Sequence, residues 1–270
     1  MSSTRLSTTF LAAFLTIAGS AAPAFAEVNL VLNGGFEDVT LNGAPATQSE
    51  QLAKSGNTQA GVVATGWTNT GYGFIFTPGS ADQGGAVTPE FNSTTTLWGP
   101  GAAGGGSNNG LTATSPFGGN YLVEDGGYEP GAIYQSIGGL SVGGNYLLTF
   151  DWAAAQEHNA AYVSPTTESW YFGFGNQYSQ TQVVSTPGKG FTPWMQASYL
   201  FTASATSQLL GFLAAGTPAG QPPYSLLDGV SLVAAPEPSA WSILVMGLVG
   251  VGGAGWLRRR AAARSAAALS

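Results

Sequence analysis

Among its 270 residues the sequence has no cysteine and only one histidine, His158. The absence of cysteine excludes disulfide bonds, thiol nucleophiles and zinc–thiolate sites. A histidine-dependent triad or metal site would have to use His158, and neither a G-x-S-x-G nor an H-E-x-x-H pattern accompanies it. We therefore expect a protein that is not an enzyme. A glycoside hydrolase built on two carboxylates stays open as a remote alternative, because the sequence does not give the distance between acidic groups.

Positive charge is also scarce. Between residues 27 and 235 the only cations are Lys54 and Lys189, against 13 acidic residues, so this segment carries a net charge of −11. Phosphate backbones are bound by clustered lysine and arginine, which excludes nucleic acid as a partner. An acidic surface suits divalent cations or neutral polymers, although the same charge also serves to keep an exported protein soluble.

Charge of either sign is absent from residues 240–257. At ~1.5 Å per residue, a helix over this apolar run reaches ~27 Å, close to the hydrocarbon thickness of a bilayer. We therefore expect a transmembrane helix that leaves the following basic residues in the cytoplasm. The run is preceded by Pro236, Glu237 and Pro238 and followed by Arg258, Arg259, Arg260 and Arg264.

This order of a Pro-Glu-Pro triplet, an apolar span and an arginine cluster resembles the PEP-CTERM sorting signal of Gram-negative bacteria. The resemblance implies that residues 236–264 form a sorting signal, with residues 265–270 as a cytoplasmic tail. It also implies recognition and cleavage of the signal by an exosortase, a membrane-embedded cysteine protease. The protein would then be held briefly in the inner membrane before it reaches the cell surface or the extracellular matrix. Such families are associated with exopolysaccharide and biofilm formation.

The N-terminus has the features of a cleaved signal peptide. Arg5 provides a positive charge, residues 10–18 form a short apolar core, and Ala24 and Ala26 give the small-x-small pattern that signal peptidase recognises. We expect residues 1–26 to direct export through the Sec pathway, so that the mature chain starts at Glu27.

The remaining segment, residues 27–235, is predicted to be all-β. The chain has 40 glycines, and periodicity typical of amphipathic helices is scarce. Short runs of β-branched and aromatic residues separated by glycine or proline are typical of strands joined by turns. Their number and spacing favour one antiparallel β-sandwich rather than two domains. The expected strands cover residues 28–32, 66–68, 73–77, 120–124, 132–137, 145–152, 169–174, 196–202, 208–214 and 225–233, with irregular segments at 41–61 and 99–110.

The order of several short motifs is similar to that of galactose-binding-like jelly-roll modules, a group that includes carbohydrate-binding modules. The motifs are NLVLNGGFE at 29–37, GW at 66–67, GGNYLV at 118–123, IYQSI at 133–137, NYLLTFDWA at 145–153 and LDGVSL at 227–232. The resemblance implies a jelly-roll β-sandwich. It does not fix the function, because such modules bind sugars, bind proteins or act as spacers.

A structural calcium ion is the candidate cofactor. Glu37 and Asp38 come shortly after the first expected strand, and Asp228 lies in the last, so a jelly roll would bring the three carboxylates together. Calcium prefers oxygen ligands of this kind, and the resemblance implies a calcium site at about this place. The alternative is that Glu37 and Asp228 accept hydrogen bonds from loop and turn amides.

The candidate ligand-binding residues are aromatic side chains for stacking on a sugar ring, with amides for its hydroxyl groups. Trp98 and Trp194 stand beside glycine, proline or threonine and are expected to be exposed, whereas Trp67, Trp152 and Trp170 lie in strands and are expected to pack. The full candidate set is Trp98, Trp194, Tyr72, Asn120 and Gln135. Two hypotheses remain: an exported carbohydrate-binding protein, and a structural surface protein without a discrete ligand.

Overall fold

The structure is a computed structural model that describes residues 28–55 and 61–235. All the regular elements of these residues are β-strands, and none of their segments forms a helix long and apolar enough to cross a membrane. The expected signal peptide with Ala24 and Ala26, and the expected sorting signal with its transmembrane helix, lie outside the described residues.

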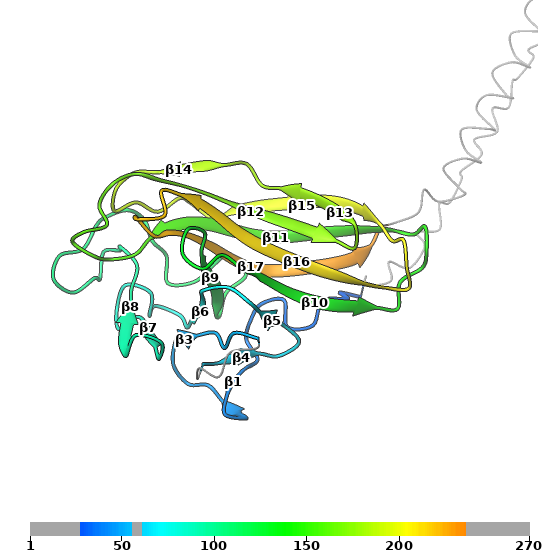
Figure 1. The fold of residues 1–270 in the computed structure, drawn as a ribbon, viewed down its shortest axis with the longest axis horizontal. Coiled ribbons are helices and arrows are strands. Elements are labelled where there is room, and N and C mark those ends of the chain that lie inside the picture. Colours follow the sequence, from blue (N-terminus) through cyan, green and yellow to red (C-terminus); the bar gives the residue numbers. More distant parts are fainter. Residues whose placement is uncertain (1–27, 56–60, 236–270) are drawn as a thin grey trace, which may run out of the picture.

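Two large sheets form the body (Figure 1). The eight-stranded sheet has the order β15 (Met195–Thr202), β11 (Asn145–Gln156), β17 (Pro223–Ala234), β9 (Tyr121–Asp125), β6 (Gly73–Phe76), β3 (Glu50–Gln51), β7 (Ala86–Thr88) and β8 (Ser93–Thr95). The six-stranded sheet has the order β13 (Gln177–Gln180), β12 (Thr166–Phe174), β16 (Ser207–Thr217), β10 (Ala132–Gly138) and β5 (Thr68–Asn69), with β14 (Val184–Thr186) paired to β12. A small sheet contains β2 (Ala44–Pro45), β1 (Val39–Leu41) and β4 (Val63–Ala64).

The long strands run across the molecule in two layers, and the short strands β1 to β8 gather on one side of them (Figure 1). The chain crosses between the two large sheets from β9 to β10, from β10 to β11 and from β11 to β12. Every strand pair is antiparallel except β3 with β7. The described residues therefore confirm the predicted all-β sandwich, and successive crossings of this kind are how jelly rolls connect their strands.

The main core lies between the two large sheets. In β11 the side chains of Tyr146, Leu148, Phe150 and Trp152 point into it, which is the alternation expected from the sequence. Trp170 of β12 enters from the other sheet, and its indole nitrogen donates a hydrogen bond of 3.1 Å to the carbonyl of Leu226. The expected packing of Trp67, Trp152 and Trp170 is confirmed.

A second core covers part of the outer face of the eight-stranded sheet. Phe74 and Phe76 of β6 point away from the main core and pack with Tyr121 of β9, Ala153 of β11 and Leu97, which precedes the irregular segment at 99–110. Burial on both faces explains why β11 extends to Gln156, beyond the expected end at Trp152.

Nine of the ten expected strands overlap observed ones, and the tenth, residues 28–32, is not a strand. There the side chain of Asn29 forms hydrogen bonds with the backbone of β17. Its Oδ1 accepts from the amide of Leu232, and its Nδ2 donates to the carbonyl of Val230. This side-chain pairing replaces part of a strand ladder. The expected loop at 41–61 contains the short strands β2 and β3, whereas residues 99–110 hold no strand, as expected.

Candidate functional site

Three tyrosines frame a slot on the outer face of the six-stranded sheet. The strand register aligns Tyr178 of β13, Gly173 of β12, Gly211 of β16 and Tyr134 of β10 in one row across the sheet. Neighbouring strands are ~4.8 Å apart, so the two tyrosine positions stand roughly 14 Å from each other. Tyr171 lies one row away on the same face.

Two glycines form the floor of this tyrosine slot. A Cβ atom at Gly173 would lie 2.6 Å from Cδ1 of Tyr178, so the Tyr178 ring rests against the bare backbone of β12. A Cβ atom at Gly211 would meet only Tyr134 Cβ at 3.4 Å and Ile133 O at 3.7 Å, so the space above β16 stays open. Glycine inside a strand weakens it and often marks a place where a ligand approaches the backbone.

The tyrosine slot has a volume of about 330 Å³, within the range of ligand pockets. Leu209 and Leu213 complete its walls, and none of its lining residues is charged. Tyr178 is 76% exposed, Tyr171 47% and Leu209 53%. The slot is therefore an uncharged, largely apolar groove that is open to solvent on this face of the sheet. The arrangement offers ring faces for stacking and phenol groups for hydrogen bonds to hydroxyl groups.

The residues predicted from the sequence to bind a ligand do not gather at the tyrosine slot. The expected exposure of Trp98 is wrong: its side chain is only 5% exposed. Its indole nitrogen donates to the carbonyl of Tyr162 at 3.1 Å, and the Lys189 ammonium lies 4.5 Å from its ring. Trp194 is half-buried, donates to the Thr112 hydroxyl and packs edge-on against Tyr121.

The predicted polar partners are engaged inside the protein. Gln135 is buried and forms two hydrogen bonds with the backbone of Leu32, as donor at 2.9 Å and as acceptor at 2.8 Å. The side-chain amide of Asn120 donates to the carbonyl of Phe36. Tyr72 is buried as well, and its ring lines a different pocket on the side of the eight-stranded sheet.

The predicted calcium ligands are brought together only in part. Asp228 is fully buried, and its carboxylate accepts hydrogen bonds from the Ser115 hydroxyl and from the amide of Gly229. Burial raises the pKa of Asp228 to about 7, and the nearby charge of Glu37 contributes in the same direction. The Glu37 carboxylate accepts from the amide of Asn120, and Asp38 is exposed.

These contacts are the hydrogen bonds to loop amides that the sequence left as an alternative. Among residues 28–55 and 61–235, no three acidic or histidine side chains come close enough to hold a metal ion. Glu37 and Asp228 supply carboxylate oxygens of the type that calcium prefers, but both carboxylates already accept hydrogen bonds. The calcium site therefore stays a prediction.

Sequence reasoning missed the tyrosine slot, although two signals for it were present. Tyr171 stands between Trp170 and Phe172, so a strand with those two side chains in the core must point Tyr171 outward. Gly173 and Gly211 interrupt strands that are otherwise rich in apolar residues. The cross-strand alignment of these glycines with Tyr134 and Tyr178 depends on the register, which the sequence does not give.

No family model matches the sequence. Among curated proteins, halomucin of Haloquadratum walsbyi is 28% identical over 124 residues, which make up 46% of this chain and 1% of halomucin. The chain thus spans only a small fraction of that relative.

Solved structures with loosely similar folds include three carbohydrate-binding modules. TmCBM61, solved in complex with beta-1,4-galactotriose, is 11% identical with a TM-score of 0.39, and the match covers 77% of this chain and 99% of that one. The CBM22-1 xylan-binding domain of Paenibacillus barcinonensis Xyn10C is 12% identical with a TM-score of 0.36, covering 79% and 99%. A CBM4 structure is 14% identical with a TM-score of 0.32, covering 76% and 99%.

Proposed function

We propose that the chain is an exported carbohydrate-binding protein without catalytic activity, and that the tyrosine slot holds a neutral polysaccharide. The supporting observation is the row in which Tyr178 and Tyr134 flank a floor of glycine. The three tyrosines provide flat apolar surfaces with phenol groups at their edges, which match the apolar faces and the hydroxyl groups of a sugar ring. The lack of charge in the tyrosine slot favours a neutral glycan over an anionic one.

Two substitutions test this proposal. Tyr178→Ala should weaken polysaccharide binding roughly tenfold, because loss of an anchoring aromatic side chain commonly costs more than ~1 kcal/mol. Gly211→Val should reduce binding at least as much by filling the floor of the slot, while the strand tolerates its β-branched side chain. Binding is measured on a glycan array and then by titration calorimetry with the best glycan.

The matched control is Gly138→Val, because a Cβ atom at Gly138, on the same sheet but outside the slot, would meet nothing within 4 Å. Binding that survives both Tyr178→Ala and Gly211→Val would contradict the proposal. An array without any signal would favour the alternative, a structural surface protein without a discrete ligand. Release of reducing sugar from a bound glycan would support the remaining alternative, a glycoside hydrolase.

The proposed cellular route is that of an exosortase substrate. In this proposal the Sec pathway and signal peptidase deliver the protein, the span at 240–257 holds it in the inner membrane, and exosortase releases it to the cell surface or matrix. The support is the order of Pro236-Glu237-Pro238, the uncharged run and the arginines from 258 to 260. A glycan-binding domain placed outside the cell would serve to attach to exopolysaccharide.

Replacing Pro236, Glu237 and Pro238 together by alanine should leave the full-length protein in the membrane fraction, because the protease would lose its recognition element. The measurement is an immunoblot of membrane and medium fractions. Ser239→Ala, next to the triplet, serves as the control and should leave processing unchanged. Equal release of the triple-alanine variant and the wild type would refute the sorting role.

Calcium bound at Glu37 and Asp228 should raise the melting temperature, because a cation would relieve the repulsion between two carboxylates held near each other. The melting temperature is compared in excess calcium and in chelator. The same melting temperature in both conditions would remove calcium from the proposal.

A further inference from the structure

A second pocket lies on the side of the eight-stranded sheet, away from the tyrosine slot. Its volume is about 350 Å³, and it is walled by the rings of Tyr72, Phe91 and Tyr128. The centroid of Tyr72 lies 5.1 Å from that of Tyr128 and 6.0 Å from that of Phe91, and Phe91 and Tyr128 are 6.3 Å apart. Three rings at these mutual distances form an aromatic cluster that lines the pocket.

Two carboxyl groups line the same pocket, Asp125 at the end of β9 and Glu157 just after β11. The amides of Gly127 and Tyr128 both donate to Oδ1 of Asp125, at 2.7 and 3.0 Å, which leaves Oδ2 for a ligand. Burial raises the pKa of Asp125 to about 6. Burial, together with the charge of Asp125, raises the pKa of Glu157 to about 7.

No cation within the described residues neutralises this acidic pair. Of the two lysines between residues 27 and 235, Lys54 pairs with Glu90 and Glu129, and Lys189 lies over the ring of Trp98. The pocket therefore combines aromatic walls with two carboxyl groups whose negative charge no cation of the described residues compensates.

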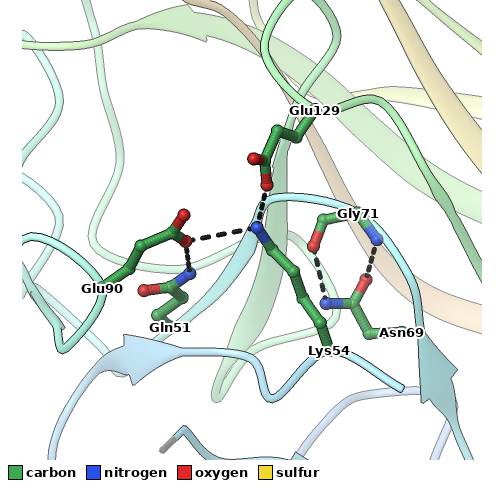
Figure 2. A network of polar contacts seen from close by, with 6 residues as sticks. All are labelled: Gln51, Lys54, Asn69, Gly71, Glu90 and Glu129. Carbon is green, nitrogen blue, oxygen red and sulfur yellow. Dashed lines mark hydrogen bonds and ion pairs between the residues drawn. The ribbon is translucent and has the colours of Figure 1, made fainter. Parts of the chain in front are cut away.

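Lys54 bridges Glu90 and Glu129, two residues that adjoin the aromatic walls in the sequence; Figure 2 shows the bridge. Its ammonium group lies 3.2 Å from Oε2 of Glu90, bonds to Glu129, and sits 5.3 Å from the centroid of Tyr72. Glu90 precedes Phe91 and Glu129 follows Tyr128, so one lysine ties the two ring-bearing loops together. Burial lowers the pKa of Lys54, but the hydrogen bonds to Glu129 and Glu90 and the charges of these two residues together outweigh burial and raise this pKa. The ammonium group of Lys54 therefore stays charged.

We propose that this pocket binds the protonated amine of an amino sugar. Ring faces attract ammonium groups, and desolvated carboxylates strengthen that attraction. Calcium fits less well, because it needs six to eight oxygens, whereas this pocket has aromatic walls and the described residues contain no group of three potential metal-binding side chains. A neutral sugar would leave the charge of the acidic pair uncompensated. The choice of a sugar as the carrier of the amine rests on the proposed carbohydrate-binding function, whereas the choice of an ammonium group rests on the pocket alone.

The ionisation of the acidic pair makes binding depend on pH. A cation binds the deprotonated carboxylates, so affinity for a permanently charged ammonium probe should rise as the pH increases through the pKa values of about 6 and about 7. The other titratable groups facing the pair are Tyr72, Tyr128, Tyr162 and Tyr224, and Glu90, which is bound to Lys54, acts on Tyr72. The pKa values of Tyr72 and Tyr224 are raised by burial, so both stay neutral over this range.

The test is titration calorimetry of the full-length protein with a glucosamine tetramer and its fully N-acetylated counterpart, at a pH just below 7. The glucosamine tetramer should bind roughly tenfold more tightly, because only it carries ammonium groups. Asp125→Asn combined with Glu157→Gln should abolish this preference, and Tyr178→Ala in the tyrosine slot should leave it unchanged. Choline, which does not titrate, should bind more tightly at pH 8 than at pH 5 by a similar factor.

Equal affinity for the two tetramers, or a preference that survives the double substitution, would overturn the proposal. A preference lost with Tyr178→Ala would assign the binding to the tyrosine slot instead. Choline binding without binding of the glucosamine tetramer, or tighter binding of a lysine-rich peptide, would refute the amino sugar as the ligand. Lys54→Met removes the lysine that connects the two loops and leaves the carboxyl groups of Asp125 and Glu157 in place. The variant should bind the glucosamine tetramer more weakly, because the loops that carry Phe91 and Tyr128 lose their connection.

Discussion

Replacing Trp170 by alanine is expected to lower the free energy of unfolding by about 3–5 kcal/mol, the usual cost of deleting a large aromatic side chain from a core. Trp170 is fully buried between the two large sheets, and its ring meets Phe212 edge-on with the centroids 6.2 Å apart. The change also leaves the carbonyl of Leu226 without its indole donor. Urea unfolding followed by circular dichroism measures the loss.

The neighbouring residue provides a matched control. Tyr171 belongs to the same strand but points to the outer face and is 47% exposed, so Tyr171→Ala should cost less than about 1 kcal/mol. The same variant should weaken glycan binding, because Tyr171 lines the tyrosine slot. Of two adjacent positions of β12, Trp170 would then determine stability and Tyr171 would determine glycan binding. Similar stability losses for the two variants would contradict the assignment of the two faces of β12.

This alternation explains how much of the fold the sequence could predict. In β11 the buried side chains of Tyr146, Leu148 and Phe150 alternate with partly exposed ones, two of which, Thr149 and Asp151, are polar, so the sequence indicates which face of the strand is buried. The expected ends were less accurate where tertiary contacts decide them. The second core buries Ala153 and Ala155, and no local pattern indicates that a distant loop covers them. The failure at residues 28–32 has the same origin, since Asn29 pairs with β17 about 200 positions later.

The candidate sites depended even more on tertiary structure. Trp98 follows a threonine-rich run and precedes a glycine-rich one, which is typical of an exposed loop, yet that loop folds back over β11. The amide of Trp98 donates to the carbonyl of Gln156 at 3.0 Å, and its indole is buried, with its nitrogen bonded to the carbonyl of Tyr162. The tyrosine slot arises from four strands in register, and its lining residues are separated by up to 81 positions, from Ala132 to Leu213. Composition pointed to aromatic sugar binding in general but not to these tyrosines.

The second large effect expected is a dependence of stability on pH to which Glu168, one of several buried carboxyl groups, contributes. This residue of β12 is fully buried, its Oε2 accepts a hydrogen bond of 2.6 Å from the Thr186 hydroxyl, and its Oε1 has no partner among the described residues. Burial raises the pKa of Glu168 from 4.5 to about 7, outweighing the hydrogen bonds from Thr166 and Thr186.

The sign follows from proton binding. Between pH 4.5 and about 7 the folded protein keeps a proton on Glu168 that the unfolded chain releases, so the free energy of unfolding falls as the pH rises through this window. The loss is complete above the folded pKa and amounts to roughly 3 kcal/mol, because a tenfold difference in proton affinity between the folded and unfolded states corresponds to about 1.4 kcal/mol. Burial raises the pKa values of Asp125, Glu157 and Asp228 in the same direction, so the wild type should be clearly more stable at pH 5 than at pH 8.

Glu168→Gln removes the charge and keeps the shape of the side chain. The variant should be roughly 2–3 kcal/mol more stable than the wild type at pH 8 and about equal to it at pH 5, because only the ionised form of Glu168 is costly to bury. Urea unfolding at both pH values gives the two differences. Asp38→Asn is the control, since that side chain is exposed and should change stability little at either pH. A glutamine variant that is less stable than the wild type at pH 8 would mean that Glu168 is held ionised in the folded state, which a cation bound close to Oε1 would explain.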